Sequence, residues 1–294
     1  MNDLGSALSA ALDEPIARLD PVAGGDLNDA YAASLADGTR VFVKTSADPA
    51  AAGSFAAEAA GLRWLADAGA LSIPELLALA DDDEAPRFLA LRWIDAGTGG
   101  FGSSAEEALG RGLAALHAAG APTFGGPADI LRVGPLALPN APTGDWPSFY
   151  AIRRLEPLAR LARDRGALPV EAPALLDRVT ARLPELAGPP EPPARVHGDL
   201  WGGNVMVDRE QRPWLIDPAA HGGHRELDLA MLRLFGGVGG IGSRCFAAYE
   251  EVSPLAPGAA ERVALWQLVP LLLHAALFGA SWGARATSVL RRYA

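Results

Sequence analysis

Short apolar runs separated by polar turns dominate the first third of the chain, and this pattern is typical of a small β-sheet. Asp37-Gly38 lies between two such runs, as expected for the turn of a hairpin. Farther on, Phe55, Ala59 and Leu62 recur at helical spacing. The elements expected in this region are a helix over residues 3–13, strands within 20–45, a helix over 53–68, and strands over 76–80 and 87–94.

From residue 103 onward the apolar positions mostly follow helical spacing. Ser103 or Ser104 is expected to cap a helix that reaches residue 119, because two glutamates follow in its first turn. Residues 120–146 contain five prolines and are expected to form an ordered loop or a substrate-side insertion. The other elements expected are helices over 146–165 and 172–186, a small hairpin of 205–207 with 214–216, and further helices with a break near Gly279.

The order of these elements predicts an α+β fold with two lobes. Residues 1–95 are expected to form an N-lobe with a small antiparallel sheet, and residues 96–294 a larger helical C-lobe with the acceptor site. A cleft between two such lobes is a natural ligand site.

Composition limits the class of protein further. Half of the 294 residues are hydrophobic, so a folded core is expected rather than disorder. The formal charge of −10 gives no electrostatic reason to expect a nucleic-acid partner. The single cysteine, Cys245, excludes an internal disulfide, fits a reducing cytoplasm, and is expected to be a buried or half-buried side chain in a helix.

Two segments bear on membrane association. The first residues carry acids where a signal peptide has basic residues, so no signal peptide is predicted. The stretch between Arg262 and Arg285 contains no charged residue and is long enough to cross a bilayer. Because Gln267 and Pro270 interrupt it, we interpret it as two buried helices and expect a soluble protein with no membrane partner.

The densest cluster of polar chemistry is HGDLWGGN at residues 197–204, followed by WLIDP at 214–218. Asp199 and Asn204 have the spacing of a kinase catalytic loop, and Asp217 follows a short apolar strand, where such kinases place a second metal-binding carboxylate. We expect Asp199 to accept the proton of an attacking hydroxyl or to orient it. Asn204 and Asp217 are expected to bind Mg²⁺, which prefers hard oxygen ligands. Asp and Asn beside glycine are also ordinary turn residues, but the complete string favours a kinase.

Lys44 is the only lysine in the chain, and arginine supplies every other basic side chain. It ends a predicted strand. Arg and Lys differ in shape and hydration, so a lone lysine suggests a position that a guanidinium could not fill.

The strings HGDLWGGNVM and IDPAAHGGHRELDLAMLRLFGG closely resemble the fructosamine kinase (ketosamine-3-kinase) family. That family belongs to the protein-kinase-like folds, together with aminoglycoside and choline phosphotransferases. The similarity runs almost from end to end. The block at 138–158, with Asp145-Trp146-Pro147 and Arg153-Arg154, is more similar to fructosamine kinases than to the other members. The resemblance implies ATP and Mg²⁺ as cofactors and attack of a sugar 3-hydroxyl on the γ-phosphate.

The resemblance also implies roles for residues outside this motif. Lys44 matches the lysine that binds the ATP phosphates, and Glu58 matches the acid that pairs with it. A solvated helix face is the alternative for Glu58. The turn expected to cover the phosphates comprises Gly24, Gly25, Asp26 and Asn28, and the hinge expected beside adenine comprises Trp93 and Ile94. For Trp93 a core position or packing between the lobes stays open as an alternative.

The aromatic and histidine residues around the motif leave alternatives open. Trp201 is expected to face the sugar or to pack. His197 is expected to brace the catalytic loop, with contact to the substrate as the alternative and a role as base or metal ligand less favoured. Asp228 is expected to bond to catalytic-loop backbone. His221 and His224 have a spacing found in zinc sites, but no third ligand is evident.

The function expected is ATP-dependent phosphorylation of a ketosamine, either a free sugar-amine or a glycated protein lysine, by a cytoplasmic monomer or weak dimer. One alternative is a kinase of another small alcohol, such as an aminoglycoside or choline. The other is a kinase-fold protein that binds nucleotide without catalysis, although none of Lys44, Asp199, Asn204 and Asp217 is missing.

Overall fold

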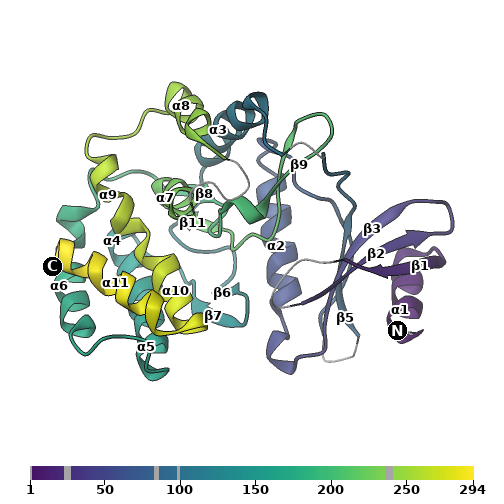
Figure 1. Ribbon diagram of the computed structural model, residues 1–294, viewed down its shortest axis with the longest axis horizontal. Coiled ribbons are helices and arrows are strands. Elements are labelled where there is room, and N and C mark those ends of the chain that lie inside the picture. The colour runs from purple at the N-terminus through teal and green to yellow at the C-terminus, as the bar shows by residue number, and fades with distance from the viewer. Residues whose placement is uncertain (1, 23–27, 83–85, 98–99, 236–240) are drawn as a thin grey trace.

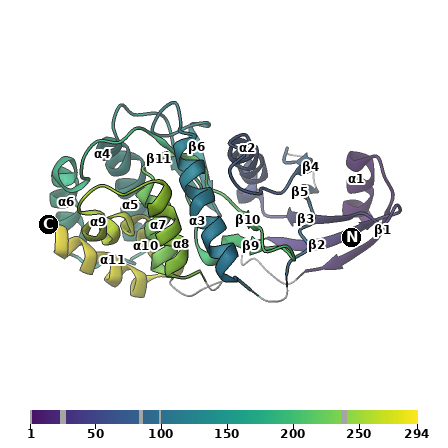
Figure 2. The same cartoon turned by 90° about the horizontal axis from the view of Figure 1, so that it is seen from above.

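The computed structural model describes residues 2–22, 28–82, 86–97, 100–235 and 241–294. It has two parts that lie side by side, with the N-terminal sheet at one end and most of the helices at the other (Figures 1 and 2). We call α1 to β5 the N-lobe and α3 to α11 the C-lobe. The N-lobe elements are α1 (Asn2–Leu12), β1 (Ile16–Pro21), β2 (Asp29–Leu35), β3 (Arg40–Ser46), η1 (Pro49–Ala51), α2 (Ser54–Ala66), β4 (Leu76–Ala80) and β5 (Arg87–Arg92).

The N-lobe sheet is antiparallel throughout, with the strand order β1-β2-β3-β5-β4. Successive residues of a strand point to opposite faces, and both faces of this sheet are covered. On one face, Phe88 and Ala90 of β5 belong to a cluster with Leu8 of α1. On the other face, Leu89 and Leu91 pack with the buried residues of α2. This explains why the apolar run of β5 is continuous rather than alternating.

Two strand boundaries differ from those expected. β1 begins at Ile16, before residue 20, because an edge strand with no fully buried residue gives only a weak apolar pattern. β5 ends at Arg92, so Trp93 and Ile94 follow the strand instead of belonging to it.

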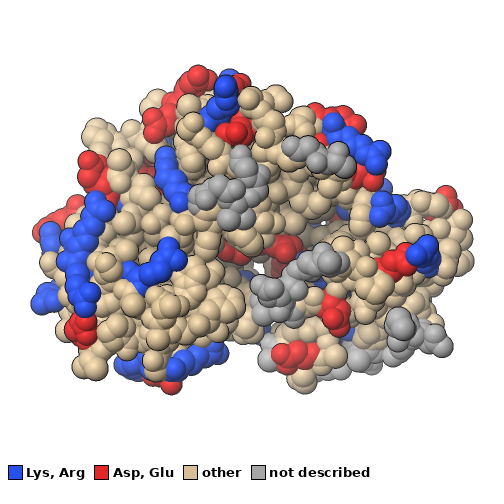
Figure 3. All heavy atoms as spheres, viewed as in Figure 1, with Lys and Arg blue, Asp and Glu red and all other residues tan. Residues whose placement is uncertain are grey.

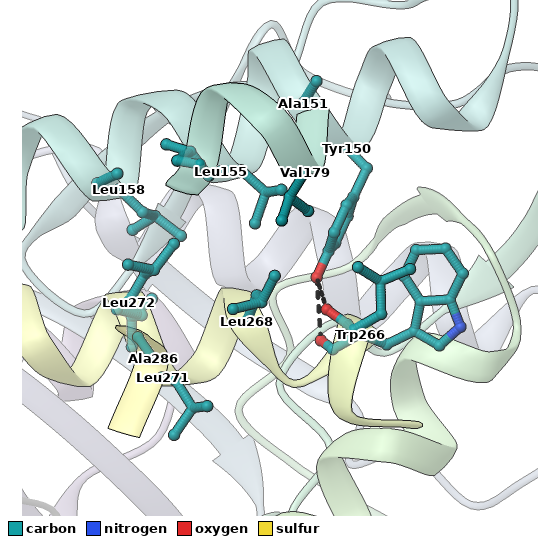
Figure 4. Packing of buried hydrophobic residues seen from close by; sticks show 14 of the residues in the cluster. Tyr150, Ala151, Leu155, Leu158, Val179, Trp266, Leu268, Leu271, Leu272 and Ala286 are labelled. Carbon is teal, nitrogen blue, oxygen red and sulfur yellow. Dashed lines mark hydrogen bonds between the residues drawn. The ribbon is translucent and has the colours of Figure 1, made fainter. Parts of the chain in front are cut away.

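The C-lobe elements follow in the order α3 (Ser103–Ala118), β6 (Ile130–Val133), β7 (Leu136–Pro139), α4 (Trp146–Phe149), η2 (Tyr150–Leu155), α5 (Glu156–Asp164), α6 (Ala172–Leu186), β8 (Ala194–Val196), η3 (Gly202–Asn204), β9 (Val205–Val207), β10 (Pro213–Leu215), β11 (His221–Gly223), α7 (Glu226–Leu234), α8 (Ser243–Val252), α9 (Ala259–Trp266), α10 (Leu268–Phe278) and α11 (Ala280–Tyr293). The main C-lobe core lies between η2, α5, α6, α10 and α11 (Figure 4). There the Tyr150 hydroxyl, which is fully buried, donates to the carbonyls of Leu265 at 2.8 Å and Trp266 at 3.2 Å.

The C-terminal helices bear on the uncharged stretch noted in the sequence. The helical stretch 259–278 is long and apolar enough to cross a membrane by length and composition alone. However, 61% of its 18-residue apolar window is buried inside the molecule. The expected break is confirmed, because Gly279, with φ 97°, separates α10 from α11.

The proline-rich segment 120–146 contains a β-hairpin that the sequence pattern did not predict. β6 and β7 pair over four residues each, from Ile130↔Pro139 to Val133↔Leu136. Strands this short hold too few apolar positions to stand out among prolines and glycines. Part of the segment expected to form an ordered loop or a substrate-side insertion is therefore a hairpin, and residues 132–135 of it line the cavity described below.

Two helices begin or continue differently from the prediction. Neither Ser103 nor Ser104 caps α3: Gly102 occupies the cap with extended backbone and no side-chain cap bond. Glu106 is one of the two glutamates in the first turn that led us to expect a serine cap. It accepts a hydrogen bond from Gly242 N at 2.9 Å instead. The helix expected over 146–165 is interrupted by the π-helical η2, which carries Arg153 and Arg154.

Candidate active site

The HGDLWGGN string folds as a loop between β8 and β9. His197 follows β8, and Asn204 ends η3 just before β9 begins. Asp217 follows β10, which pairs with β9, so the hairpin predicted there is confirmed. Asp217 has φ 54°, a left-handed conformation that Asp tolerates better than most residues. The chain therefore returns Asp217 to the loop that holds Asp199 and Asn204.

Asn204 connects the two ends of the catalytic loop. Its side-chain amide nitrogen donates to the backbone carbonyl of Asp199 at 2.8 Å and to Asp199 Oδ2 at 3.1 Å. Because the nitrogen is committed to Asp199, the amide oxygen remains as a neutral ligand for a cation.

Asp199 is positioned to handle a proton. Burial raises its pKa to about 6, although the hydrogen bond from Asn204 opposes the shift. A carboxylate with a pKa near the working pH is an effective general base.

Lys44 of β3 joins the two lobes. Its ammonium lies 2.8 Å from Glu58 Oε1 on α2, so the predicted ion pair is present, and it also contacts Asp217 Oδ1. Burial alone would lower the pKa of Lys44, but the carboxylates of Glu58 and Asp217 outweigh it and hold the pKa above its ordinary value. Lys44 is therefore a fixed positive charge beside the catalytic loop.

Asp228 of α7 holds the catalytic loop by hydrogen bonds to its backbone. Its carboxylate accepts from the backbone amides of His197 at 2.7 Å and Gly198 at 2.9 Å, which confirms the backbone role expected for it. Burial alone would raise the pKa of Asp228, but the contact with His117 Nε2 at 3.2 Å, followed by the His197 ring and the bond from Gly198 N, keeps the pKa below its ordinary value.

His197 is a structural brace and does not line the cavity described below. Its Nε2 lies 2.9 Å from the carbonyl of Ile216, which ties the catalytic loop to the segment that carries Asp217. Burial lowers its pKa, so the ring is neutral at neutral pH. The alternative of a substrate contact for His197 is therefore not favoured.

A cavity of about 820 Å³ lies between the lobes. In the space-filling view a hollow separates the two parts, with acidic atoms visible at its edge (Figure 3). Every described residue that the sequence assigned to the site, except His197, lines this cavity, namely Asn28, Lys44, Glu58, Trp93, Ile94, Asp199, Trp201, Asn204 and Asp217. Gly24, Gly25 and Asp26 lie outside the described residues.

Trp93 and Trp201 occupy different walls. The Arg40 guanidinium lies 3.8 Å over the Trp93 ring, and Trp93 lines the cavity just after β5 ends. The Trp201 ring lies 5.8 Å from the Phe235 ring and covers Gly203, where an added Cβ would lie 2.3 Å from the indole. Trp201 thus both packs and lines the cavity, so the two alternatives for it are compatible.

Sequence reasoning missed one wall of the cavity. It consists of apolar and aromatic side chains from α7, its C-terminal end and α10, namely Met231, Phe235, Leu273, His274, Leu277 and Phe278. His274 Nδ1 bonds to the carbonyl of Pro270 at 2.7 Å, and burial lowers the pKa of the ring. These residues occur in helices that look like ordinary core helices, so no local signal separates them from the core.

Mg²⁺ is the metal that the donor set fits. Among the described residues no group of three or more His, Cys, Asp or Glu side chains could hold a metal, which also gives no support to zinc at His221 and His224. Magnesium is commonly held by only one or two protein oxygens plus phosphates and water. The Asn204 oxygen and the Asp217 carboxylate could supply those two ligands.

Comparisons with known proteins agree with this site. The family model for fructosamine kinase matches residues 1–294. A "probable ketoamine kinase" of Enterococcus faecium is 32% identical over 274 residues, with 93% of this chain and 94% of the relative covered. A crystal structure from Thermobifida fusca, provisionally named fructosamine-3-kinase, superposes with a TM-score of 0.90 at 41% identity and covers 99% of this chain and 98% of that one.

More distant structures show the fold alone. Spectinomycin phosphotransferase superposes with a TM-score of 0.62 at 15% identity, covering 99% of this chain and 93% of that one. The expected two-lobed, protein-kinase-like fold is confirmed, and the chain belongs to the fructosamine kinase family.

Proposed function

We propose that this protein uses ATP and Mg²⁺ to phosphorylate the 3-hydroxyl of ketosamines, sugars joined to an amine through their reducing end. The observation that carries the proposal is the meeting of two groups of residues in one cavity. Lys44 and Glu58 come from the N-lobe, and Asp199, Asn204 and Asp217 come from the C-lobe. Family membership supports the choice of ATP and of a ketosamine acceptor.

The nucleotide is held by the charged residues at the lobe boundary. Asn204 and Asp217 would hold Mg²⁺, which would supply neutralisation of the phosphate charge. Lys44 binds phosphate oxygens, and Glu58 keeps its ammonium in place. In the structure Lys44 contacts Asp217; with nucleotide bound, the Lys44 ammonium would face the phosphates and the Asp217 carboxylate would be free to ligate a cation.

Asp199 handles the proton of the acceptor. As the 3-hydroxyl oxygen forms its bond to the γ-phosphorus, the bond between that phosphorus and the β–γ bridging oxygen breaks and ADP leaves. Asp199 accepts the hydroxyl proton, which its raised pKa of about 6 favours. Asn204 holds the carboxylate in position during this step.

The acceptor wall favours a ketosamine over a polycationic aminoglycoside. Among the described residues, the side chains of this wall (Met231, Phe235, Leu273, His274, Leu277 and Phe278) carry no carboxylate, whereas the carboxylates that line the cavity, Asp48, Glu58, Asp199 and Asp217, come from other segments. A drug with several ammonium groups would need carboxylates there for complementarity. Trp201 and Phe235 instead offer apolar ring faces, which suit one face of a sugar and a single amine.

We also propose that the protein works in the cytoplasm, without a nucleic-acid or membrane partner, as a monomer or weak dimer on free or protein-bound ketosamines. The acidic net charge and the buried Cys245 thiol support this setting.

An ATP-consumption screen tests the function. Fructosamines, ribulosamines, aminoglycosides and choline are offered separately, with Asp199→Asn as the inactive control, and NMR locates the phosphate on any product. We expect turnover with ketosamines and a product phosphorylated at the sugar 3-position. Turnover only with an aminoglycoside or choline would overturn the acceptor assignment. Calorimetric binding of Mg-ATP with no turnover of any acceptor would instead indicate a nucleotide-binding protein without catalysis.

A further inference from the structure

The β6–β7 hairpin belongs to the C-lobe but reaches the N-lobe. β6 packs against α2, and the two lie next to each other in both views of the chain (Figures 1 and 2). Arg132 of β6 donates from Nη2 to the carbonyl of Ala52 at 2.9 Å. Ala52 lies in the turn that leads directly into α2, so the hairpin contacts this helix at its start.

The base of the hairpin is firmly anchored in the C-lobe. Arg154 of η2 is 1% exposed, and its two terminal nitrogens donate to the Pro139 carbonyl at 2.8 Å and to Asn140 Oδ1 at 2.7 Å. Asn140 in turn donates to the carbonyls of Gly126 and Ala128. Buried charge-assisted hydrogen bonds of this kind fix geometry. Arg154 and Asn140 come from the 138–158 block that marks similarity to fructosamine kinases, so this block builds the support of the hairpin.

The first turn of α2 is held from two directions. From the N-lobe, the Asp81 carboxylate accepts from the amides of Gly53 at 3.2 Å and Ala56 at 2.7 Å. From the C-lobe, Arg132 holds Ala52. Glu58 lies about one turn farther along the same helix, 2.8 Å from Lys44 Nζ. Because a helix moves as a unit, a shift of its first turn changes the position of Glu58 relative to Lys44.

We propose that Arg132 is a positioning residue for nucleotide binding: through it, the anchored β6–β7 hairpin holds α2 where Glu58 keeps Lys44 in place for the phosphates. Arg132 also lines the cavity, so a direct contact with a ligand is the rival explanation. The inference depends on the proposed function only for turnover. Mg-ATP binding can be measured without any acceptor, and this separates a failure of the inference from a failure of the acceptor assignment.

The test compares Arg132→Met and Arg132→Lys with a matched control. Arg87 of β5, which does not line the cavity, donates from Nη1 to the Asp48 carbonyl at 2.9 Å in the same β3–α2 connection and from Nε to the Asp82 carbonyl at 3.2 Å, both within the N-lobe. Arg132→Met should weaken Mg-ATP binding and lower kcat/KM for ATP by about 3- to 10-fold, the range expected for loss of one hydrogen bond. Arg132→Lys should recover part of the loss, because it keeps a donor. Arg87→Met should behave like the unmodified protein.

Two further measurements separate positioning from direct contact. Hydrogen exchange of the α2 amides should accelerate in Arg132→Met and not in Arg87→Met. In a Glu58→Gln background, Arg132→Met should add less than about twofold to the loss of ATP affinity, because the two changes interrupt one path. A full additional loss in that background would show that Arg132 acts directly on the ligand and would overturn the proposal. Unchanged exchange in α2 would overturn it as well.

Discussion

The two halves of the candidate site are held in different ways. The C-lobe half is fixed from within its own lobe: buried Asp228 accepts from the His197 and Gly198 amides, and Asn204 bonds to Asp199. The N-lobe half depends on both lobes, because Lys44 contacts Asp217 across the boundary and the α2 helix is held by Arg132. The residues proposed to handle the proton are therefore preorganised within one lobe, whereas the residues proposed to bind phosphate depend on how the two lobes meet.

This difference predicts distinct consequences of mutation. Changes to the residues that hold the C-lobe half, such as Asp228, should reduce both the free energy of unfolding and kcat, because they break buried contacts within one lobe. Changes in the N-lobe half should mainly affect nucleotide affinity.

The largest effect is expected from Asp199→Asn. The variant keeps the size of the side chain but loses the carboxylate that receives the proton, so kcat should fall by about 100- to 10,000-fold while Mg-ATP binding is nearly unchanged. Steady-state kinetics and calorimetry measure the two quantities on the same preparation. Retained turnover would remove Asp199 from the proposed chemistry.

Lys44→Arg should give the next largest effect, and on the other half of the site. A planar guanidinium cannot occupy the position of the ammonium between Glu58 and Asp217. Displacement of the charge by about 1 Å can lower kcat/KM for ATP by as much as about 100-fold. Thermal unfolding serves as the control for folding. Kinetics equal to those of the unmodified protein would mean that Lys44 has no role in binding phosphate.

Asp228→Asn should affect stability more than any change in the N-lobe half. In this variant an NH₂ group replaces one carboxylate oxygen, so a backbone N–H that donated to that oxygen now meets another donor. The free energy of unfolding should fall by about 2–4 kcal/mol. Urea denaturation measures the loss. Glu58→Gln should cost less, because Lys44 keeps Asp217 as a partner. Equal losses for the two variants would contradict the contrast between the halves.

Acid should weaken the C-lobe first, because the histidines whose pKa burial lowers, His197, His221, His224 and His274, all lie there. Burial lowers the pKa of His221 to about 3, so the unfolded chain, with a pKa near 6.5, binds the proton first as the pH falls. This histidine therefore stabilises the fold above pH 6.5, and its contribution is lost as the pH falls toward 3, by about 2 kcal/mol at pH 5. In His221→Gln, the unfolding free energy should change less between pH 7 and pH 5. An unchanged pH dependence would show that His221 is not the titrating group.

The smallest effect is expected at Cys245. Its side chain is fully buried in α8, and burial raises the pKa of the thiol to about 12. Iodoacetamide at pH 8 should leave the native protein unlabelled and active, and should label it after unfolding. Mass spectrometry distinguishes the two cases. Rapid labelling of the native protein would contradict the prediction, because it would show that this part of α8 opens to solvent.

The sequence predicted the C-lobe half of the site better than its surroundings. The spacing of Asp199, Asn204 and Asp217 is encoded in one short loop and one hairpin, so a local pattern is enough to predict it. Lys44 and Glu58 also follow from strand and helix patterns.

The remaining walls depend on long-range packing. Phe235 and His274 come from elements whose sequences resemble core helices, and the contact between Arg132 and Ala52 joins residues 80 positions apart. No spacing rule predicts such a contact. The cap expected at Ser103 is absent for a similar reason: Glu106 accepts its hydrogen bond from Gly242, which lies 136 residues farther along the chain.

The position of Lys44 has a consequence for the chemical durability of the molecule. Reducing sugars condense with unprotonated amines, and lysine side chains on a protein surface are ordinary targets. Here the one lysine is 8% exposed, and its neighbours keep it protonated. A protein that meets reactive sugars and their adducts thus offers them no exposed lysine side chain to modify.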